Sequence, residues 1–204
     1  MTTHSRYDTA HSKSDVSDSQ VGFVVYPTYR IVDEVIDSEK NVDNSKNPNN
    51  KKSKKALVYL FGRLKNGESF LTINSYKLYF YITTEDYKQI LKEKSVKFTK
   101  YLEDFNGIVE DTDFKNFKDE NVVKITLKIP TDVAKFRKIL EDEFSINCFE
   151  ADIRFYQRFL IDHDIKGSLE ISGTYKKGNY VDRIYEEPIL KPSDWIPVLK
   201  ILSI

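Results

Sequence analysis

The sequence predicts an α+β fold with a βαββαβ unit in the middle of the chain, and three observations support this. Residues 121–129 alternate polar and apolar side chains with the period of a β-strand. Residues 130–144 begin with a proline and place apolar side chains at helical spacing. The dipeptide Asn66-Gly67 separates two apolar runs, as in a tight hairpin. The chain therefore combines antiparallel strands with amphipathic helices.

The first part of the chain reads as a tail followed by antiparallel strands. Residues 1–20 are rich in Ser, Thr and Asp and almost lack large apolar side chains, which predicts a disordered tail. Residues 21–32 are β-branched and aromatic, and we expect a strand there. The Asn- and Lys-rich residues 37–55 predict a mobile insertion. Two further strands flank Asn66-Gly67 and should pair as a hairpin.

The βαββαβ unit follows from the order of patterns between residues 76 and 151. Strands are expected at residues 76–82, 105–111, 121–129 and 146–151, and helices at 84–94 and 130–144. This order is the split, ferredoxin-like arrangement. One face of the first strand must be core. Its other face carries Tyr79 and Tyr81, which can stack bases or form an ordinary exposed sheet surface.

The segment FEADIRFYQRFLIDHDIKGSLEI, residues 149–171, predicts an amphipathic helix after this unit. Asp152 is placed to cap a helix that begins at Ile153, and Gly167 ends it. Arg158 lies one helical turn before Asp162 and can form an ion pair with it. These features fit a helix that docks on the preceding unit.

Composition excludes several classes of function. The chain has 204 residues with 32 basic and 32 acidic side chains, so its overall charge attracts neither nucleic acid nor membranes. Cys148 is the single cysteine, which excludes an internal disulfide and Cys-rich zinc sites. The N-terminus lacks the apolar core of a signal peptide, and no apolar run is long enough to span a membrane. We expect a cytoplasmic protein without a membrane partner.

No catalytic or metal-binding constellation emerges from the residues. The three histidines have no ligand spacing, and the acidic run between residues 111 and 120 reads as a loop surface. The stretches GRLKNG and KKGN lack the spacing of phosphate-binding loops. We therefore expect no catalytic residue, no bound metal and no cofactor in this chain.

Residues 149–171 resemble the signature that precedes the proofreading exonuclease domain in family B DNA polymerases. The stretches VGFVVYPTYRIVD, ALVYLFGRLKNGESFLTINSYKLYFYI, VVKITLKIPTDVAKFRKIL and VDRIYEEPILKPSDWIPVLKILSI resemble, in the same order, the N-terminal region of archaeal and bacterial members. The resemblance implies a polymerase N-terminal domain at residues 21–151. It also implies that residues 152–204 form a linker helix, a hairpin and the first strand of an RNase H-like exonuclease domain.

In the family, the strand that resembles LKILSI runs into an Asp-Ile-Glu-Thr motif whose carboxylates hold the exonuclease metals. Two-metal hydrolysis needs such carboxylates. This chain ends at Ile204, before that motif. We therefore expect a truncated or split polymerase, and Mg²⁺ would be needed only by the complete enzyme.

The resemblance also implies a pocket for an unstacked template base, which archaeal relatives use to detect uracil. The matching positions are Tyr79 in the wall, Pro130 and Val133 in the floor, Ile153 and Phe155 in the helix against it, and Arg158 as an anchor or phosphate contact. Leu78 and Arg154 depart from the archaeal pattern, which has proline at both positions. Because proline presets the backbone, we expect general guidance of single-stranded template rather than uracil detection.

The expected function is thus the template-strand-binding portion of a family B DNA-directed DNA polymerase. Its partners would be single-stranded template DNA and the remaining polymerase polypeptide, with its exonuclease, palm, fingers and thumb. The alternative is a polymerase-derived interaction module that docks other replication subunits. A free-standing RNA-binding domain is a third possibility, but residues 121–129 lack the basic-aromatic signature that such modules carry.

Overall fold

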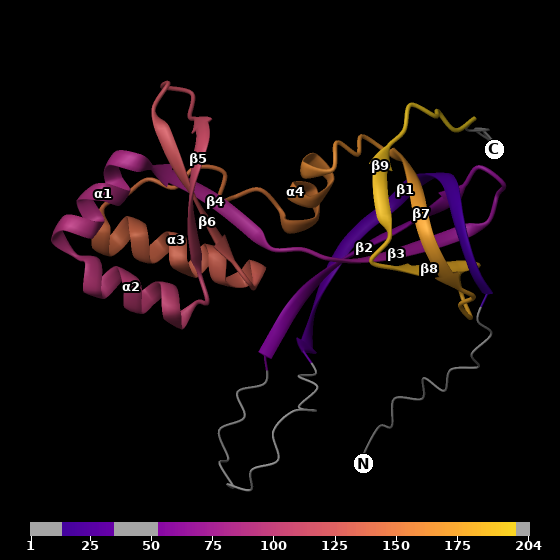
Figure 1. Ribbon diagram of the computed structural model, residues 1–204, viewed down its shortest axis with the longest axis horizontal. Coiled ribbons are helices and arrows are strands. Elements are labelled where there is room, and N and C mark those ends of the chain that lie inside the picture. Colours follow the sequence, from indigo (N-terminus) through magenta and orange to yellow (C-terminus); the bar gives the residue numbers. More distant parts are fainter. Residues whose placement is uncertain (1–13, 35–52, 199–204) are drawn as a thin grey trace, which may run out of the picture. The chain divides into compact units, whose positions relative to one another are not determined.

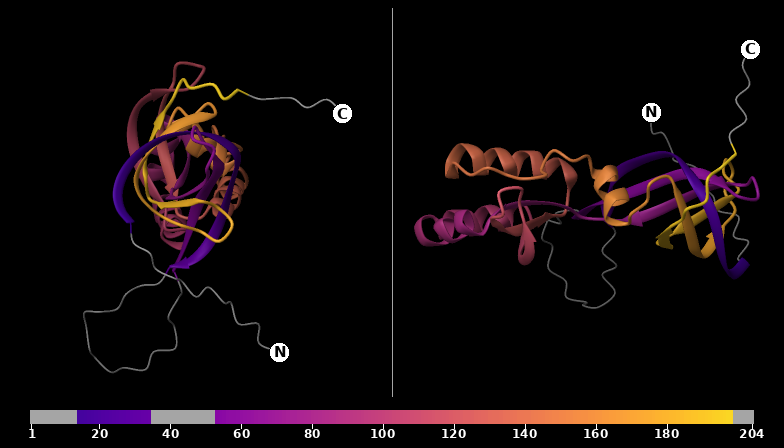
Figure 2. Two further views of the ribbon diagram at one scale, coloured as in Figure 1. Left: turned by 90° about the vertical axis from the view of Figure 1, so that its right-hand side faces the viewer. Right: turned by 90° about the horizontal axis from the view of Figure 1, so that it is seen from above.

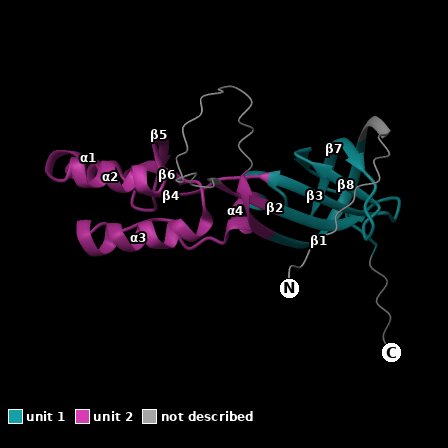
Figure 3. Ribbon diagram, turned by 90° about the horizontal axis from the view of Figure 1, so that it is seen from below, with its two compact units in different colours: residues 1–28, 59–74, 160–204 teal, residues 29–58, 75–159 magenta. Residues whose placement is uncertain are grey.

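The computed structural model describes residues 14–34 and 53–198 and divides them into two compact units (Figure 3). Unit 1 takes the described residues up to 28, residues 59–74 and those from 160 onward. Unit 2 takes the described residues between 29 and 58 and residues 75–159. The units are interleaved along the chain.

Unit 1 is built from strands. They are β1 (Ser14–Glu34), β2 (Ser53–Leu64), β3 (Ser69–Ser75), β7 (Ser168–Lys176), β8 (Arg183–Glu186) and β9 (Ile189–Pro192), of which β1 and β2 continue into unit 2. The sheet order is β1-β2-β3-β8-β7-β9, and β7 also pairs with β1. The strands β1, β2, β3, β8 and β7 therefore close into a barrel (Figure 2).

The core of the barrel consists of fully buried apolar side chains and one buried tyrosine. These are Leu60, Phe70, Leu169, Ile171 and Tyr185. The predicted hairpin between β2 and β3 is confirmed: Leu64 N–H donates to the Glu68 carbonyl at 2.8 Å. Gly67 has a φ of +92°, which a glycine adopts without strain.

One prediction fails in unit 1 because of pairings between distant segments. Residues 14–20, predicted to belong to a disordered tail, form the start of β1, where Asp18 pairs with Gly173 and Gln20 with Ile171. Residues 168–192, for which a hairpin and the start of an exonuclease domain are predicted, belong to the same sheet as β1 to β3. The remaining tail, most of the insertion at 37–55, and LKILSI from residue 199 lie outside the described residues.

Unit 2 contains a three-stranded sheet and four helices (Figure 1). The elements are β4 (Leu78–Thr83), α1 (Thr84–Glu93), α2 (Ser95–Asp104), β5 (Ile108–Lys115), β6 (Asn121–Leu127), α3 (Pro130–Phe144) and α4 (Phe155–Asp162), whose last turn runs into unit 1. The sheet order is β4-β6-β5, and both pairs are antiparallel. The chain thus has the mixed α+β architecture that the sequence predicts.

The core of unit 2 lies between one face of this sheet and its helices. Phe80 and Ile125 of the sheet and Phe136 of α3 are fully buried. The ring of Phe136 lies 6.2 Å from that of Phe98 in α2, measured between centroids. The alternation of β4 and β6 and the apolar stripe of α3 are therefore confirmed as core-forming patterns.

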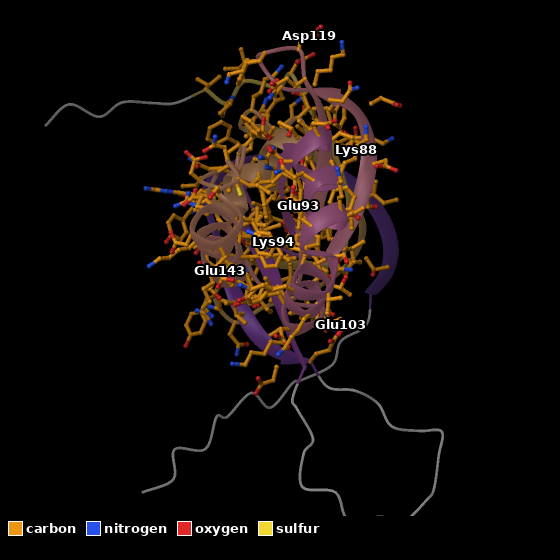
Figure 4. The ribbon with its side chains drawn as sticks, turned by 90° about the vertical axis from the view of Figure 1, so that its left-hand side faces the viewer. Lys88, Glu93, Lys94, Glu103, Asp119 and Glu143 are labelled. Carbon is orange, nitrogen blue, oxygen red and sulfur yellow. The ribbon has the colours of Figure 1, made fainter. Side chains whose placement is uncertain are left out.

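Helix ends in unit 2 are fixed by one local cap and by contacts between helices. Thr83 caps α1, since its hydroxyl accepts a hydrogen bond from Asp86 N–H at 3.0 Å. Lys94, at the joint of α1 and α2, donates from its ammonium to the Glu143 carbonyl of α3 at 2.7 Å (Figure 4). Lys97 Nζ lies 2.5 Å from the Glu143 carboxylate. These contacts hold the C-terminal end of α3 against α2.

Three elements of unit 2 differ from prediction. The strand expected at 146–151 is reduced to one bridge between Tyr81 and Phe149. α2 was not predicted; its N-cap, Lys94, makes no side-chain capping bond, and Phe98 is its single fully buried residue. α4 begins at Phe155 instead of Ile153. Tertiary packing, which the local pattern does not encode, sets all three.

Candidate nucleic-acid interface

A pocket of about 350 Å³ lies in unit 2 beside the first turn of α3. Its walls come from β1, the start of β4, α3 and the segment that enters α4. The lining residues are Tyr29, Leu78, Pro130, Thr131, Val133, Ala134, Ala151, Ile153, Arg154, Phe155 and Tyr156. The volume falls at the lower end of the range for pockets that hold small ligands, about 300–1,000 Å³. We call this the α3 pocket.

Local sequence rules place the α3 side of the pocket. Pro130 occupies the first helical position, where its missing N–H breaks no helical hydrogen bond. Val133 and Ala134 follow at three and four residues, so they share the same helix face. Leu78 is buried at the start of β4 and completes the apolar floor.

The opposite wall is aromatic, and it is held by ring contacts. Phe155 is buried, and its centroid lies 5.3 Å from that of Tyr29 and 5.5 Å from that of Tyr76. Tyr29 is remote from Phe155 in sequence, so no local pattern predicts this contact. The wall is thus a fixed apolar surface, and a planar ring such as a base can pack against it.

Arg154 gives the pocket its positive charge. Its side chain is exposed, and its guanidinium donates to the Tyr156 hydroxyl at 3.3 Å. That hydrogen bond raises the pKa of the Arg154 guanidinium above its usual value. The pocket therefore combines apolar walls with one permanent cation, a pairing that can accept a base and a phosphate.

Four of the six residues predicted for a template-base pocket line the α3 pocket: Pro130, Val133, Ile153 and Phe155. Tyr79 and Arg158 do not line it. Successive side chains of a strand point to opposite faces; Leu78 faces the pocket, so Tyr79 lies on the other side of the sheet. Leu78 and Arg154, which depart from the archaeal pattern, both line the pocket.

The sequence did not predict a pocket role for five of the lining residues, which are Tyr29, Thr131, Ala134, Ala151 and Tyr156. Helical spacing around Pro130 would have predicted that Thr131 and Ala134 also line the pocket. Tyr29 and Ala151 belong to segments far apart in the chain, and only the fold brings them to the pocket.

Tyr79 and Arg158 form a cluster of their own. The Arg158 guanidinium carbon lies 4.6 Å from the centre of the Tyr79 ring. One guanidinium nitrogen lies 2.7 Å from the Glu150 carboxylate and also donates to the Glu150 carbonyl at 3.3 Å. The Arg158 side chain is only 5% exposed. This ion pair with Glu150 was not predicted from the sequence.

Other chemistry is limited within the described residues. No three His, Cys, Asp or Glu side chains in that part of the chain are grouped so that they could hold a metal ion. None of the helices described is long and apolar enough to cross a membrane. Burial raises the pKa of the Cys148 thiol to about 12, which keeps it protonated and weakly nucleophilic near neutral pH.

Two comparisons with known proteins point to DNA polymerases. No family model matches the chain. A DNA polymerase of Methanocaldococcus jannaschii is 34% identical to it over 122 residues, which cover 54% of this chain and 7% of that polymerase. The solved family B DNA polymerase of the hyperthermophilic archaeon Pyrobaculum calidifontis shares its fold, with a TM-score of 0.54 and 18% identity. That match covers 87% of this chain and 21% of the polymerase.

The chain thus spans a small part of the length of each relative. The first likeness is one of sequence, and the second is one of fold. This chain is thus similar in sequence to part of an archaeal DNA polymerase and similar in fold to part of a family B DNA polymerase.

Proposed function

We propose that this chain is the template-strand-binding portion of a family B DNA-directed DNA polymerase and that it is not catalytic by itself. The observation that carries the proposal is the α3 pocket, which has apolar walls and an exposed arginine. The remaining polymerase polypeptide would supply the catalytic carboxylates and the Mg²⁺ that they hold.

The topology of both units supports this proposal. The order of elements in unit 2, with the bridge at Tyr81 and Phe149 in place of a fourth strand, corresponds to a reduced ferredoxin-like unit. The closed ring of unit 1, in which β3 and β8 are parallel, resembles the OB-fold, a five-stranded barrel that often binds oligonucleotides. Because a fold alone does not determine function, this support is secondary to the pocket.

In the proposed mode, one unstacked template base enters the α3 pocket. Pro130 and Val133 contact it from the floor, and Ile153 and Phe155 contact it from the wall. Arg154 meets a neighbouring phosphate. Tyr79 and Arg158 support the pocket indirectly, because they fix α4 and the segment before it against β4.

A salt titration of DNA binding tests the proposal. The full chain should bind a labelled oligothymidine at low salt and release it as salt rises, since phosphate contacts release counterions. Absence of binding at low salt, both alone and with the remaining polymerase polypeptide, would contradict the proposal. It would favour the alternative of a module that docks other replication subunits.

A pocket variant locates the contact. Ala134 is exposed and lines the pocket, so Ala134→Leu should fill space there without disturbing the core. We expect weaker binding of oligothymidine for Ala134→Leu and unchanged binding for Ala134→Ser, which is the size-matched control. Equal affinities for the two variants would place the contact elsewhere.

A base-specific comparison tests how selective the pocket is. Leu78 and Arg154 replace the prolines of the archaeal pattern, and both line the pocket. We therefore expect equal affinity for strands that contain uracil and strands that contain thymine. A preference for uracil would show that the pocket detects this base despite both departures.

A further inference from the structure

The three-stranded sheet of unit 2 has a second face that the α3 pocket does not use. Leu78, Phe80 and Ile82 of β4 are buried in the core, so Tyr79 and Tyr81 point the other way. Tyr81 pairs with Lys124 of β6, and Lys124 pairs with Glu110 of β5. Residues directly opposite each other in a sheet share a face. We call this the outer sheet face.

Aromatic rings form a continuous row across the outer sheet face. The centroids of Tyr79 and Tyr81 are 5.5 Å apart, and those of Tyr81 and Phe114 are 6.3 Å apart. Both pairs meet edge to face, so each ring presents a surface in a different direction. Phe114 is 62% exposed. The row thus ends in an aromatic side chain that is open to solvent.

Cations accompany this row. Lys124 Nζ lies 5.0 Å from the centre of the Tyr79 ring, and Arg158 also lies over that ring. Beside the row is a hollow of about 260 Å³ whose lining includes Lys77, Thr126 and Lys128. Lys128 pairs with Glu34 at 2.6 Å. The outer sheet face therefore places Lys124 over an aromatic ring and has two further lysines at the hollow.

We propose that the outer sheet face binds single-stranded nucleic acid by stacking bases on Tyr81 and Phe114, while Lys124 and Lys77 contact phosphates. Single-strand binding surfaces combine aromatic platforms with positive charge in this way, because every base offers a π-face and every linkage a charge. Tyr79 has a supporting role, since its ring contacts both Lys124 and Arg158. This inference rests on the proposed function. It extends the proposed contact with the strand from one base to several nucleotides.

Glu110 limits this surface. Its carboxylate lies 3.2 Å from Lys124 Nζ, and its side chain is 52% exposed. A bound phosphate would compete with this carboxylate for Lys124. Removing the charge should therefore strengthen nucleic-acid binding, an effect that a purely structural role for Glu110 does not produce.

Four variants of the full chain test the proposal by oligothymidine binding. Tyr81→Ala and Phe114→Ala should each weaken binding by roughly 5- to 100-fold, the range for loss of one stacked base. Tyr81→Phe keeps the ring and should bind as the natural chain does. Glu110→Gln should bind more tightly. Tyr180→Ala is the matched control, since Tyr180 is 98% exposed and lies in unit 1.

Photocrosslinking gives a direct readout of position. An oligonucleotide that carries iodouracil should crosslink to the peptides containing Tyr81 or Phe114, and mass spectrometry identifies them. DNA and RNA versions of the probe show which strand the face prefers. Crosslinks confined to other peptides, together with unchanged affinity of Tyr81→Ala and Phe114→Ala, would overturn the proposal.

The two proposals fail in different ways. If the natural chain binds DNA and only Ala134→Leu weakens binding, the α3 pocket stands and the outer sheet face does not. If only the variants of the outer sheet face weaken binding, the reverse holds. Absence of binding by the natural chain at low salt, both alone and with the remaining polymerase polypeptide, overturns both proposals.

Discussion

The guanidinium of Arg158 lies against the ring of Tyr79, with 4.6 Å between the guanidinium carbon and the ring centre. The two residues come from α4 and β4, and Glu150 completes the cluster through its ion pair with Arg158. The guanidinium is almost fully buried, and its neighbours offset the cost of removing a charge from water. This contact fixes the segment that lines one wall of the α3 pocket.

Replacing Arg158 should destabilise unit 2. For Arg158→Ala we expect a loss of about 3 kcal/mol in the free energy of unfolding, because both the ion pair and the cation–π contact disappear. Arg158→Lys should lose less of the free energy of unfolding, because lysine keeps the positive charge although it lacks the planar guanidinium group. Urea unfolding followed by circular dichroism measures both. Arg154→Ala is the exposed control, and an equal loss in that variant would contradict the assigned role.

Phe136→Ala should open a cavity in the core of unit 2. The Phe136 ring is fully buried, and its centroid lies 6.2 Å from that of Phe80 and 5.4 Å from that of Phe105. We expect a loss of about 3–5 kcal/mol. Hydrogen exchange should rise in β4 and β6 and remain unchanged in β7, if the units open separately. The fully exposed Phe117 provides the control, because Phe117→Ala should change stability by less than about 0.5 kcal/mol.

The pH dependence of stability should report on Glu143. Hydrogen bonds from Lys97 and Tyr101 lower the pKa of its carboxyl below the usual 4.5. A lowered pKa in the folded state adds stability above the unfolded value, and that stability is lost as the pH falls through the folded value. Glu143→Gln should therefore lower Tm near neutral pH and have little effect at strongly acidic pH. Glu141→Gln, on the same helix, is the matched control, and a Tm difference independent of pH would refute this account.

Gly62→Ala should disrupt the barrel of unit 1. A Cβ atom at this position would lie 2.1 Å from the Phe23 carbonyl oxygen and 2.5 Å from the Phe70 ring, so the backbone must shift. Overpacking of this kind costs about 1–3 kcal/mol, which thermal unfolding can measure. At Gly67, a Cβ atom would meet nothing within 4 Å, and Gly67→Asn suits its positive φ. If Gly67→Asn were the more damaging of the two, the proposed steric cause would be wrong.

Much of the candidate site could be anticipated from local sequence. The sequence pattern predicts the helix that carries Pro130 and Val133, with its observed limits of residues 130 and 144, while their place in the pocket was implied by the family resemblance. The resemblance of residues 149–171 to the polymerase signature added Ile153 and Phe155, which line the pocket. Tyr29 could not be anticipated, because it reaches the pocket from a strand more than a hundred residues away in the chain.

The sequence by itself determined the elements whose causes are local. Asn66-Gly67 specifies the turn between β2 and β3, since glycine adopts its positive φ without strain. Alternation in β4 and β6 selects which side chains form the core, because a strand has a period of two residues.

Only the tertiary structure decided the features that depend on partners far along the chain. Residues 14–20 become a strand because β7 supplies their hydrogen bonds. Phe149 forms a single bridge with Tyr81 in place of the predicted fourth strand. Arg158 of α4 lies over the ring of Tyr79, which β4 supplies from a distant part of the sequence. In such pairings, the partner of a backbone or charged group lies far away in the sequence. No local pattern encodes them.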